Sequence, residues 1–184
     1  MNELTLIRLA KIALMEAPYS NPAFPPSPYY RFLRLLAIEL KSRLSVELGV
    51  DGGGGILHMA MASVKAIGID ITNARPENIK HIQQHYSNFE FIIGDSIDMA
   101  PIIHNRFGTI DLLFIDTTHT YLQTMAEYRA YEPYLSSKAI VCLDDLNRPG
   151  MDQAWAEMPA PKKRFDKLHP SQSPTDGGFG VMWK

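Results

Sequence analysis

The sequence lacks the features that define several classes of protein. It has a single cysteine, Cys142, so no disulfide can form within the chain, and we expect this residue to pack as a small core side chain in the apolar run 139–143. No apolar run reaches the roughly 18 residues of a membrane-spanning helix. Arg8 and Lys11 interrupt the apolar stretch 4–15, which is therefore not typical of a secretory signal. We expect a cytoplasmic protein.

The chain also lacks a strong excess of charge of either sign. Its 18 Lys and Arg residues and 20 Asp and Glu residues give a net charge of −2. Such a balance provides no general attraction to nucleic acid or to an anionic membrane, and we expect neither as a partner. The one run of basic residues, 162–164, is short, and we expect it in a solvated loop or at a strand end.

What the chain does contain is a series of five short apolar runs that lead into acidic residues. The runs span residues 44–47, 66–70, 89–95, 110–116 and 139–143, and the last is followed by Asp144 and Asp145. Short runs of this kind are typical of strands that helices bury on both faces. The acidic ends lie 21 to 28 residues apart, which leaves room for one helix in each interval, as a βαβ unit requires.

Helical periodicity occupies most of these intervals. We expect helices over residues 56–64, 75–86 and 121–131, a less clearly helical segment at 96–107 and a short helix at 150–158. A helix at 29–43 precedes the first strand, after a helical lead-in and a proline-rich connector within residues 1–28. Residues 164–165 and 178–183 predict a terminal hairpin. The prediction is one α/β domain over residues 1–184, with a Rossmann-like doubly wound sheet that is mostly parallel and has a C-terminal antiparallel hairpin.

An open parallel sheet binds ligands beyond the carboxyl ends of its strands, where these acidic residues fall. The first turn reads Glu47-Leu48-Gly49-Val50-Asp51-Gly52-Gly53-Gly54-Gly55, and its glycines allow a sharp turn and a close approach of a ligand to the main chain. Glu47 and Asp51 would repel a phosphate but attract a ligand that carries an ammonium and a sulfonium. The turn therefore favours S-adenosylmethionine over a dinucleotide, for which a clean G-x-G-x-x-G would be expected.

Two further strand ends offer polar groups to a nucleoside. Asp70, followed by Ile71, is placed to accept hydrogen bonds from both ribose hydroxyls, although a dinucleotide enzyme would use it in the same way. Asp95 and Ser96 would lie beside the adenine, and a cap on the next helix is the alternative for Asp95. The predicted cofactor-binding residues are Glu47, Gly49, Asp51, Gly53, Gly54, Asp70, Ile71, Asp95, Ser96 and Asp116.

Together these motifs resemble class I S-adenosylmethionine-dependent methyltransferases. The resemblance extends from about Tyr30 to Met158. It rests on Val46-Glu47-Leu48-Gly49 with Gly53-Gly54, Gly68-Ile69-Asp70, Gly94-Asp95-Ser96, Phe114-Ile115-Asp116-x-x-His119 and Asp144-Asp145. Within the class the chain is similar to the group of macrocin-type sugar O-methyltransferases and cephalosporin-hydroxylase-like proteins. Asp51 departs from the common loop, where it replaces the middle glycine.

The resemblance implies a metal site and a general base. Asp116, Asp144 and Asp145 would supply oxygen ligands to a divalent ion, with Mg²⁺ the expected one, and His119 would be the base. Three carboxylates also suit Mg²⁺ by their own chemistry, because the set is too poor in nitrogen and sulfur for structural zinc. The alternative is that Asp144 or Asp145 caps the following helix and that His119 is a surface loop residue.

Other aromatic and histidine residues are open to a structural interpretation. We expect His58, His81, His85, His104, His169, Trp155 and Trp183 to be structural or solvated, whereas Tyr29, Tyr30 and Tyr121 could line an acceptor pocket or pack against neighbours. The predicted function is methyl transfer to the oxygen of a small-molecule acceptor, with homo-oligomer formation left open. The alternatives are an NAD(P)-dependent oxidoreductase on a similar sheet and a non-catalytic module that binds S-adenosylmethionine.

Overall fold

One mixed β-sheet divides the molecule into two helical layers. The computed structural model describes residues 1–16, 24, 27–169 and 175–184, and in these ranges seven strands form one sheet in the order β3-β2-β1-β4-β5-β7-β6. The strands are β1 (Leu44–Leu48), β2 (Lys65–Asp70), β3 (Phe89–Ile93), β4 (Ile110–Ile115), β5 (Leu135–Leu143), β6 (Lys162–Arg164) and β7 (Gly180–Trp183).

Strands β1 to β5 are parallel, and the chain order reverses at β1, which pairs with β2 on one side and with β4 on the other. Such a reversal opens a crevice at the carboxyl ends of the two central strands. Strand β7 pairs antiparallel with β5, and β6 pairs antiparallel with β7. The structure therefore confirms the prediction of a doubly wound sheet with a C-terminal antiparallel hairpin.

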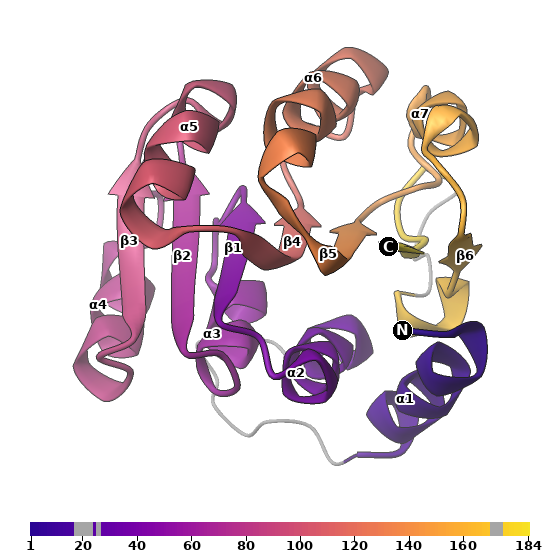
Figure 1. Ribbon diagram of the computed structural model, residues 1–184. Helices are drawn as coiled ribbons and strands as arrows, with labels where there is room; N and C mark the ends of the chain where they lie inside the picture. Colours follow the sequence, from indigo (N-terminus) through magenta and orange to yellow (C-terminus); the bar gives the residue numbers. More distant parts are fainter. Residues whose placement is uncertain (17–23, 25–26, 170–174) are drawn as a thin grey trace.

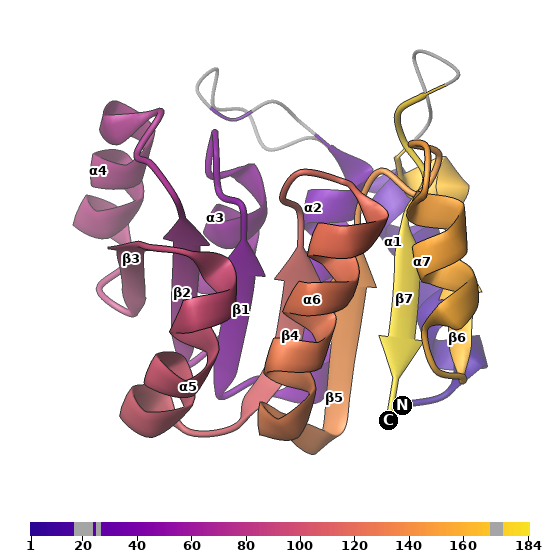
Figure 2. The ribbon, with the colours of Figure 1, turned by 90° about the horizontal axis from the view of Figure 1, so that it is seen from above.

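Helices cover both faces of the sheet, as Figures 1 and 2 show. On one face lie α1 (Glu3–Met15), α2 (Pro28–Leu40), α3 (Gly54–Ala60) and α4 (Pro76–His85), and on the other lie α5 (Ser96–Phe107), α6 (Tyr121–Tyr131) and α7 (Met151–Glu157). Two 3₁₀ turns, η1 (Glu132–Tyr134) and η2 (Asp166–Leu168), complete the described elements. Each layer forms its own apolar core against the sheet, with Phe32 and Ile56 on the first face and Ile103 and Tyr131 on the second.

Several predicted boundaries were wrong. Strand β3 ends at Ile93 instead of Asp95, because the Asp95 side chain caps α5 by accepting from the backbone N–H groups of Ile97 and Asp98. Helix α3 ends at Ala60, four residues early, since the chain already turns toward β2 through two hydrogen bonds to the Met59 carbonyl. The weakly patterned segment 96–107 forms the full helix α5, and β5 begins four residues before the predicted start.

The N-terminal lead-in belongs to the core. In α1, Leu6 and Ala13 are fully buried, and the Arg31 guanidinium of α2 donates a hydrogen bond of 2.8 Å to the Ala13 carbonyl. Most of the predicted proline-rich connector, residues 21–28, lies outside the described residues. Cys142 is buried in the sheet, as predicted, and the basic run 162–164 forms the edge strand β6.

Within the described ranges, no helix is long and apolar enough to cross a membrane.

Candidate active site

The turn after β1 passes directly against the end of β4. Gly49 has a φ of +81°, and a Cβ atom at this position would overlap the carbonyl group of Asp116. Only glycine meets both demands without strain, so the turn requires the residue type found there. Because β1 and β4 are the strands between which the chain order reverses, this close approach lies at the floor of the crevice.

Asp70, at the end of β2, holds the glycine turn in place. Its Oδ2 accepts hydrogen bonds from the backbone N–H groups of Val50 (2.8 Å) and Asp51 (3.1 Å), and its Oδ1 accepts from Thr72 N–H (3.1 Å). A carboxylate has about four acceptor positions, so Oδ1 keeps one for a ligand. Ribose binding by Asp70 stays a prediction, and the structure gives the residue a second role in shaping the loop.

A first cleft of about 430 Å³ opens beside these residues. Seven predicted cofactor residues line it: Gly49, Asp51, Asp70, Ile71, Asp95, Ser96 and Asp116. In capping α5, the Asp95 side chain accepts both hydrogen bonds at Oδ1, so capping does not exclude a ligand at Oδ2.

Glu127, in the middle of α6, forms a wall of this cleft that sequence reasoning missed. It is fully buried and accepts hydrogen bonds from Ser96 Oγ (2.6 Å), Thr117 Oγ1 (2.9 Å) and Gln123 Nε2 (2.9 Å). Burial raises the pKa of Glu127, although these bonds oppose that effect. No local pattern marks Glu127 as buried, because the apolar and polar residues of α6 are not cleanly separated along the helix.

A second cleft of about 390 Å³ adjoins the first and shares Gly49, Asp51, Asp116 and Thr117 with it. Its other lining residues include Tyr29, Tyr30, Gly54, Arg75, His119, Asp144, Asp145 and His169. Tyr29 and Tyr30 thus line a cleft, and their contact with an acceptor stays a prediction. Tyr121 instead donates a hydrogen bond to Glu157 outside both clefts.

The three carboxylates predicted to bind a metal lie close together. The side chains of Asp116 and Asp144 are in hydrogen-bonding contact, and burial together with the charges of Asp144, Glu47 and Asp145 raises the pKa of Asp116. Asp145 accepts from the backbone N–H of Gly177 (2.6 Å) and from Arg148 Nε (2.7 Å). Helix α7 is capped by Gly150, so the alternative that Asp144 or Asp145 caps it is wrong.

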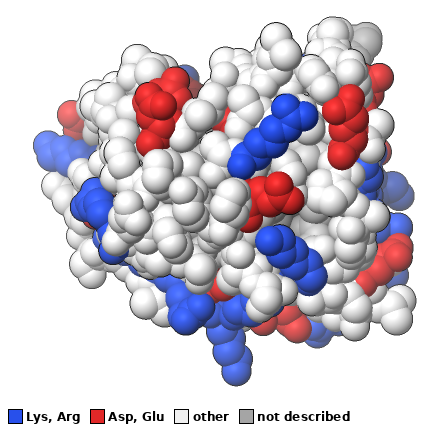
Figure 3. Space-filling view, turned by 45° about the horizontal axis from the view of Figure 1, so that its top comes forward, with Lys and Arg blue, Asp and Glu red and all other residues white. Residues whose placement is uncertain are grey.

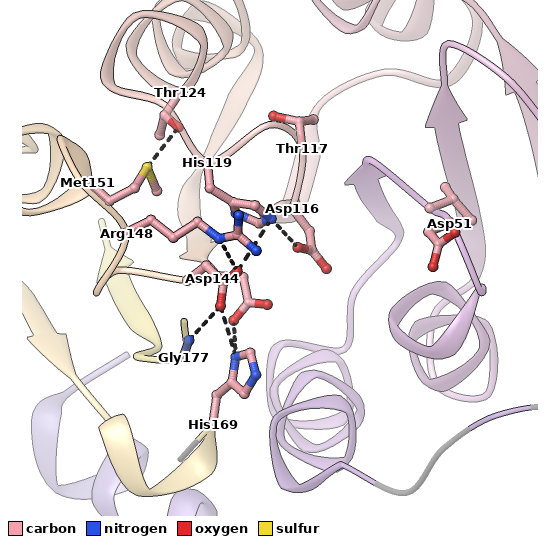
Figure 4. A network of polar contacts seen from close by, with 12 residues as sticks. Asp51, Asp116, Thr117, His119, Thr124, Asp144, Arg148, Met151, His169 and Gly177 are labelled. Atoms are coloured by element: carbon pink, nitrogen blue, oxygen red, sulfur yellow. Dashed lines mark hydrogen bonds and ion pairs between the residues drawn. The ribbon is translucent and has the colours of Figure 1, made fainter. Parts of the chain in front are cut away.

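His119 faces two of these carboxylates (Figure 4). Its Nε2 lies 3.5 Å from Asp116 Oδ1 and 3.7 Å from Asp145 Oδ2. The side chain is only 14% exposed, so the surface-loop alternative for His119 is wrong, and burial lowers its pKa. Asp51, His119 and Asp145 all have positive φ, between 34° and 51°. Backbone strain of this kind gathers at functional sites.

His169, which was expected to be structural or solvated, lies against the acidic residues of the second cleft. Its Nδ1 lies 2.7 Å from Asp144 Oδ1 and 3.8 Å from Asp145 Oδ1, and its ring stacks on Tyr29 with the centroids 4.6 Å apart. The segment after η2 brings it back over the strand ends, which no local pattern indicates. The contacts of His58 and His85 are with backbone carbonyls one turn earlier in their own helices, as expected of structural residues.

Glu47 lies beneath the glycine turn and lines neither cleft. It is 1% exposed, its Oε2 has no hydrogen-bond partner, and a Cβ atom on Gly55 would collide with it. Burial, the largest cause, raises its pKa well above the ordinary value. Gly53 also lies outside the lining, with a φ of +80° at the start of α3. Direct contact of either residue with a cofactor stays a prediction.

The fold is a doubly wound α/β domain with an acidic crevice at the carboxyl ends of its strands. Residues 46–146 match a family described as a methyltransferase domain, and the chain belongs to this family. The uncharacterized protein R132 of Acanthamoeba polyphaga mimivirus is 32% identical over 130 residues, which are 64% of this chain and 57% of that protein. The chain thus spans little more than half the length of this curated relative.

Solved O-methyltransferases share the architecture. A putative O-methyltransferase from Klebsiella pneumoniae has a TM-score of 0.69 at 15% identity, with 100% of this chain and 90% of that one covered. The O-methyltransferase from Bacillus cereus in complex with SAH has a TM-score of 0.69 at 16% identity, with 100% of this chain and 92% of that one covered. The O-methyltransferase TomG from Streptomyces achromogenes in complex with SAM has a TM-score of 0.68 at 17% identity, with 98% of this chain and 89% of that one covered. At such low identity the likeness establishes the fold.

Proposed function

We propose that the chain transfers a methyl group from S-adenosylmethionine to an oxygen atom of a small hydroxylated molecule. The observation that carries the proposal is the charge of the two clefts. Seven carboxylates line them: Asp51, Asp70, Asp95, Asp116, Glu127, Asp144 and Asp145. Among the described lining residues Arg75 is the one Lys or Arg, and it lies 3.8 Å from Asp51. Such a surface attracts a sulfonium and an ammonium and opposes the pyrophosphate of NAD(P).

The arrangement of the two clefts supports binding of the donor in one and of the acceptor in the other. The first cleft, with Asp70 and Asp95, would take the adenosine half of the donor. The second, with Tyr29 and His119, would take the acceptor. The two clefts meet at Gly49 and Asp116, and the reactive methyl group would lie there between donor and acceptor. Alignment of two reactants in this way can supply most of the acceleration that a methyl transfer needs.

His119 is suited to accept the acceptor's proton. Because burial lowers its pKa, the imidazole is neutral near pH 7 and can take a proton at Nε2. Asp116 and Asp145, within 3.7 Å of Nε2, would stabilise the positive charge that then forms. The acceptor oxygen bonds to the methyl carbon as the carbon–sulfur bond breaks, and sulfur keeps the electron pair of that bond.

The carboxylates beside His119 also fit a divalent cation. The carboxyl groups of Asp116, Asp144 and Asp145 lie close together, and Arg148 forms an ion pair with Asp145. Buried like charges are costly without a cation between them. Asp144 and Asp145, together with Asp116, would hold the ion. An ion held there would lower the pKa of an acceptor hydroxyl.

The proposed partner is a small molecule. We propose that the chain binds neither nucleic acid nor membranes. Figure 3 supports this for the face that bears α5 and α6, where Lys and Arg side chains are interspersed with Asp and Glu and with uncharged surface. The net charge of −2 agrees with this distribution. Homo-oligomer formation and a cytoplasmic location stay predictions.

Calorimetric titration of S-adenosylmethionine, with Mg²⁺ and with EDTA, tests the donor, and NADH is the matched control. We expect binding of the first ligand and none of the second. Release of S-adenosylhomocysteine over a panel of sugars and phenols then tests turnover. His119→Ala should reduce turnover about 10²- to 10⁴-fold while leaving donor affinity nearly unchanged.

Three outcomes would count against the proposal. Absence of S-adenosylmethionine binding in both buffers would remove the function. Binding without turnover on any acceptor would favour the non-catalytic module. A large loss of donor affinity in His119→Ala would remove the role given to that residue.

A further inference from the structure

We propose that His169 joins Asp144 and Asp145 as a ligand of the divalent ion, and that its nitrogen makes the site prefer Mn²⁺ to Mg²⁺. The inference rests on the proposed metal site and deepens it, because it adds a ligand and names the class of ion. It assigns a function to a residue that lies outside the region matched by the family, residues 46–146.

The spacing of the three side chains is that of ligands around one ion. One ligand atom from each of Asp144, Asp145 and His169 lies within 4.8 Å of the others. His169 Nδ1 is 2.7 Å from Asp144 Oδ1 and 3.8 Å from Asp145 Oδ1. Ligands about 2.1 Å from an octahedral ion lie about 3 Å apart when adjacent and about 4 Å apart when opposite. Small adjustments would therefore bring all three onto one cation.

The His169 ring is held in its orientation by contacts that involve no metal. It stacks on Tyr29, and its backbone carbonyl accepts a hydrogen bond of 3.0 Å from Gly178 N–H. The neighbouring Gly177 N–H binds Asp145 Oδ1, so the same segment positions both an acidic ligand and the histidine. Figure 4 shows His169 directed at Asp144 from the side opposite His119 and Arg148. Such outside support of a ligand is typical of metal sites.

A second observation points to a cation at this place. Asp144 is almost fully buried, and its carboxylate contacts that of Asp116. Arg148 forms its ion pair with Asp145, on the other side of the cluster. Asp116 pairs with His119 and Asp144 with His169, and a divalent ion beside the two carboxyl groups would relieve the repulsion between them when both are ionised.

The nitrogen donor decides which ion is preferred. Mg²⁺ is bound almost entirely by oxygen, whereas imidazole suits Mn²⁺ and the later first-row metals. An all-oxygen set of Asp116, Asp144 and Asp145 would favour Mg²⁺, so the addition of a nitrogen ligand from His169 shifts the preference toward Mn²⁺. His169→Asp should restore an all-oxygen site.

The test uses the full chain and Mn²⁺ itself as the probe. Free Mn²⁺ is measured by electron paramagnetic resonance during titration, with Mg²⁺ as competitor. We expect Mn²⁺ to bind about tenfold or more tightly than Mg²⁺, and His169→Ala to weaken Mn²⁺ binding about 10- to 100-fold. His169→Asp should retain binding but lower the ratio of Mn²⁺ to Mg²⁺ affinity.

Electron spin-echo modulation from ¹⁴N gives a direct readout of histidine ligation. We expect the ¹⁴N modulation of bound Mn²⁺ to disappear in His169→Ala and to persist in His119→Ala, with His85→Ala as a remote control on α4. Circular dichroism and S-adenosylmethionine titration of each variant show that it is folded.

Persistence of the ¹⁴N signal in His169→Ala, equal affinity for the two ions, or absence of Mn²⁺ binding would each overturn the inference. Because donor binding is measured separately, failure of S-adenosylmethionine to bind would overturn the proposed function and leave the metal result standing.

Discussion

The glycines in the turn after β1 differ in whether the backbone requires them, and substitution by alanine tests this difference. Gly49 combines a positive φ with a Cβ position that the Asp116 carbonyl already occupies. Gly52, in the same turn, has open space around its Cβ position and no positive φ. The two glycines form a matched pair in which only one is required by the backbone.

We expect Gly49→Ala to lower the free energy of unfolding by about 2–4 kcal/mol, because strain and a clash with backbone add together. Gly52→Ala should change it by less than about 1 kcal/mol. Urea denaturation of both variants measures the free energy of unfolding, and titration with S-adenosylmethionine measures donor binding by each. Equal effects in the two variants would show that the close approach to Asp116 is not what fixes the turn.

Glu47 gives a prediction about pH. Since burial raises its pKa, the folded protein keeps a proton on Glu47 at pH values where the unfolded chain has lost it. Its contribution to stability is therefore greatest below the ordinary Glu pKa and is lost as the pH rises toward the folded-state pKa. Glu47→Gln has no proton to lose. Relative to the wild type it should gain stability progressively as the pH rises above the ordinary Glu pKa.

Urea unfolding of the wild type and of Glu47→Gln at several pH values measures this difference. Glu77→Gln is the control, because Glu77 lies exposed in the first turn of α4. A difference between Glu47→Gln and the wild type that is the same at every pH would contradict the assignment of a buried, protonated carboxyl.

At the scale of the element, two leucines of α1 test whether packing against the core stabilises this helix. Leu6 is fully buried against the rest of the core, whereas Leu4, on the same helix, is 79% exposed. We expect Leu6→Ala to cost about 2–5 kcal/mol and Leu4→Ala less than about 0.5 kcal/mol. Thermal unfolding of the two variants checks the prediction. Similar, small losses in both would mean that α1 contributes little to the stability of the core.

The same scale shows what sequence patterns could and could not predict. The parallel strands were predictable because burial on both faces gives them continuous apolar runs, and the acidic residues that follow them meet at one edge of the sheet. The place of Asp116, Asp144 and Asp145 followed from this rule. Glu127 was missed because it lies inside a helix whose apolar and polar residues are not cleanly separated, so only its tertiary contacts with Ser96 and Thr117 define its place.

At the scale of the whole molecule, the site draws on parts of the chain that are far apart in the sequence. The family match covers residues 46–146, yet Tyr29 precedes it and His169 follows it. Their rings stack on each other, so the N-terminal helical layer and the segment before β7 meet at the crevice. No periodicity could predict this contact, because it depends on the antiparallel return of β7 along β5.

That return predicts that a chain ending at Met158 does not fold, although it keeps every residue of the family match. Strand β7 covers the edge of β5, and Phe179 and Val181 are fully buried, with the Phe179 ring 5.9 Å from that of Phe114. Burial of each such side chain stabilises the fold by about 1.5–3 kcal/mol, so the loss of several approaches the total stability of a domain, about 5–15 kcal/mol. We expect the shortened chain to lack a cooperative transition in urea and to bind a hydrophobic dye.

A chain that lacks only Lys184 should unfold almost as the full chain does, because it loses one backbone hydrogen bond to Ala139. Cooperative unfolding of the shortened chain near the full-chain midpoint would show instead that the hairpin lies outside the folding unit, and that the methyltransferase core needs neither β7 nor His169 to form.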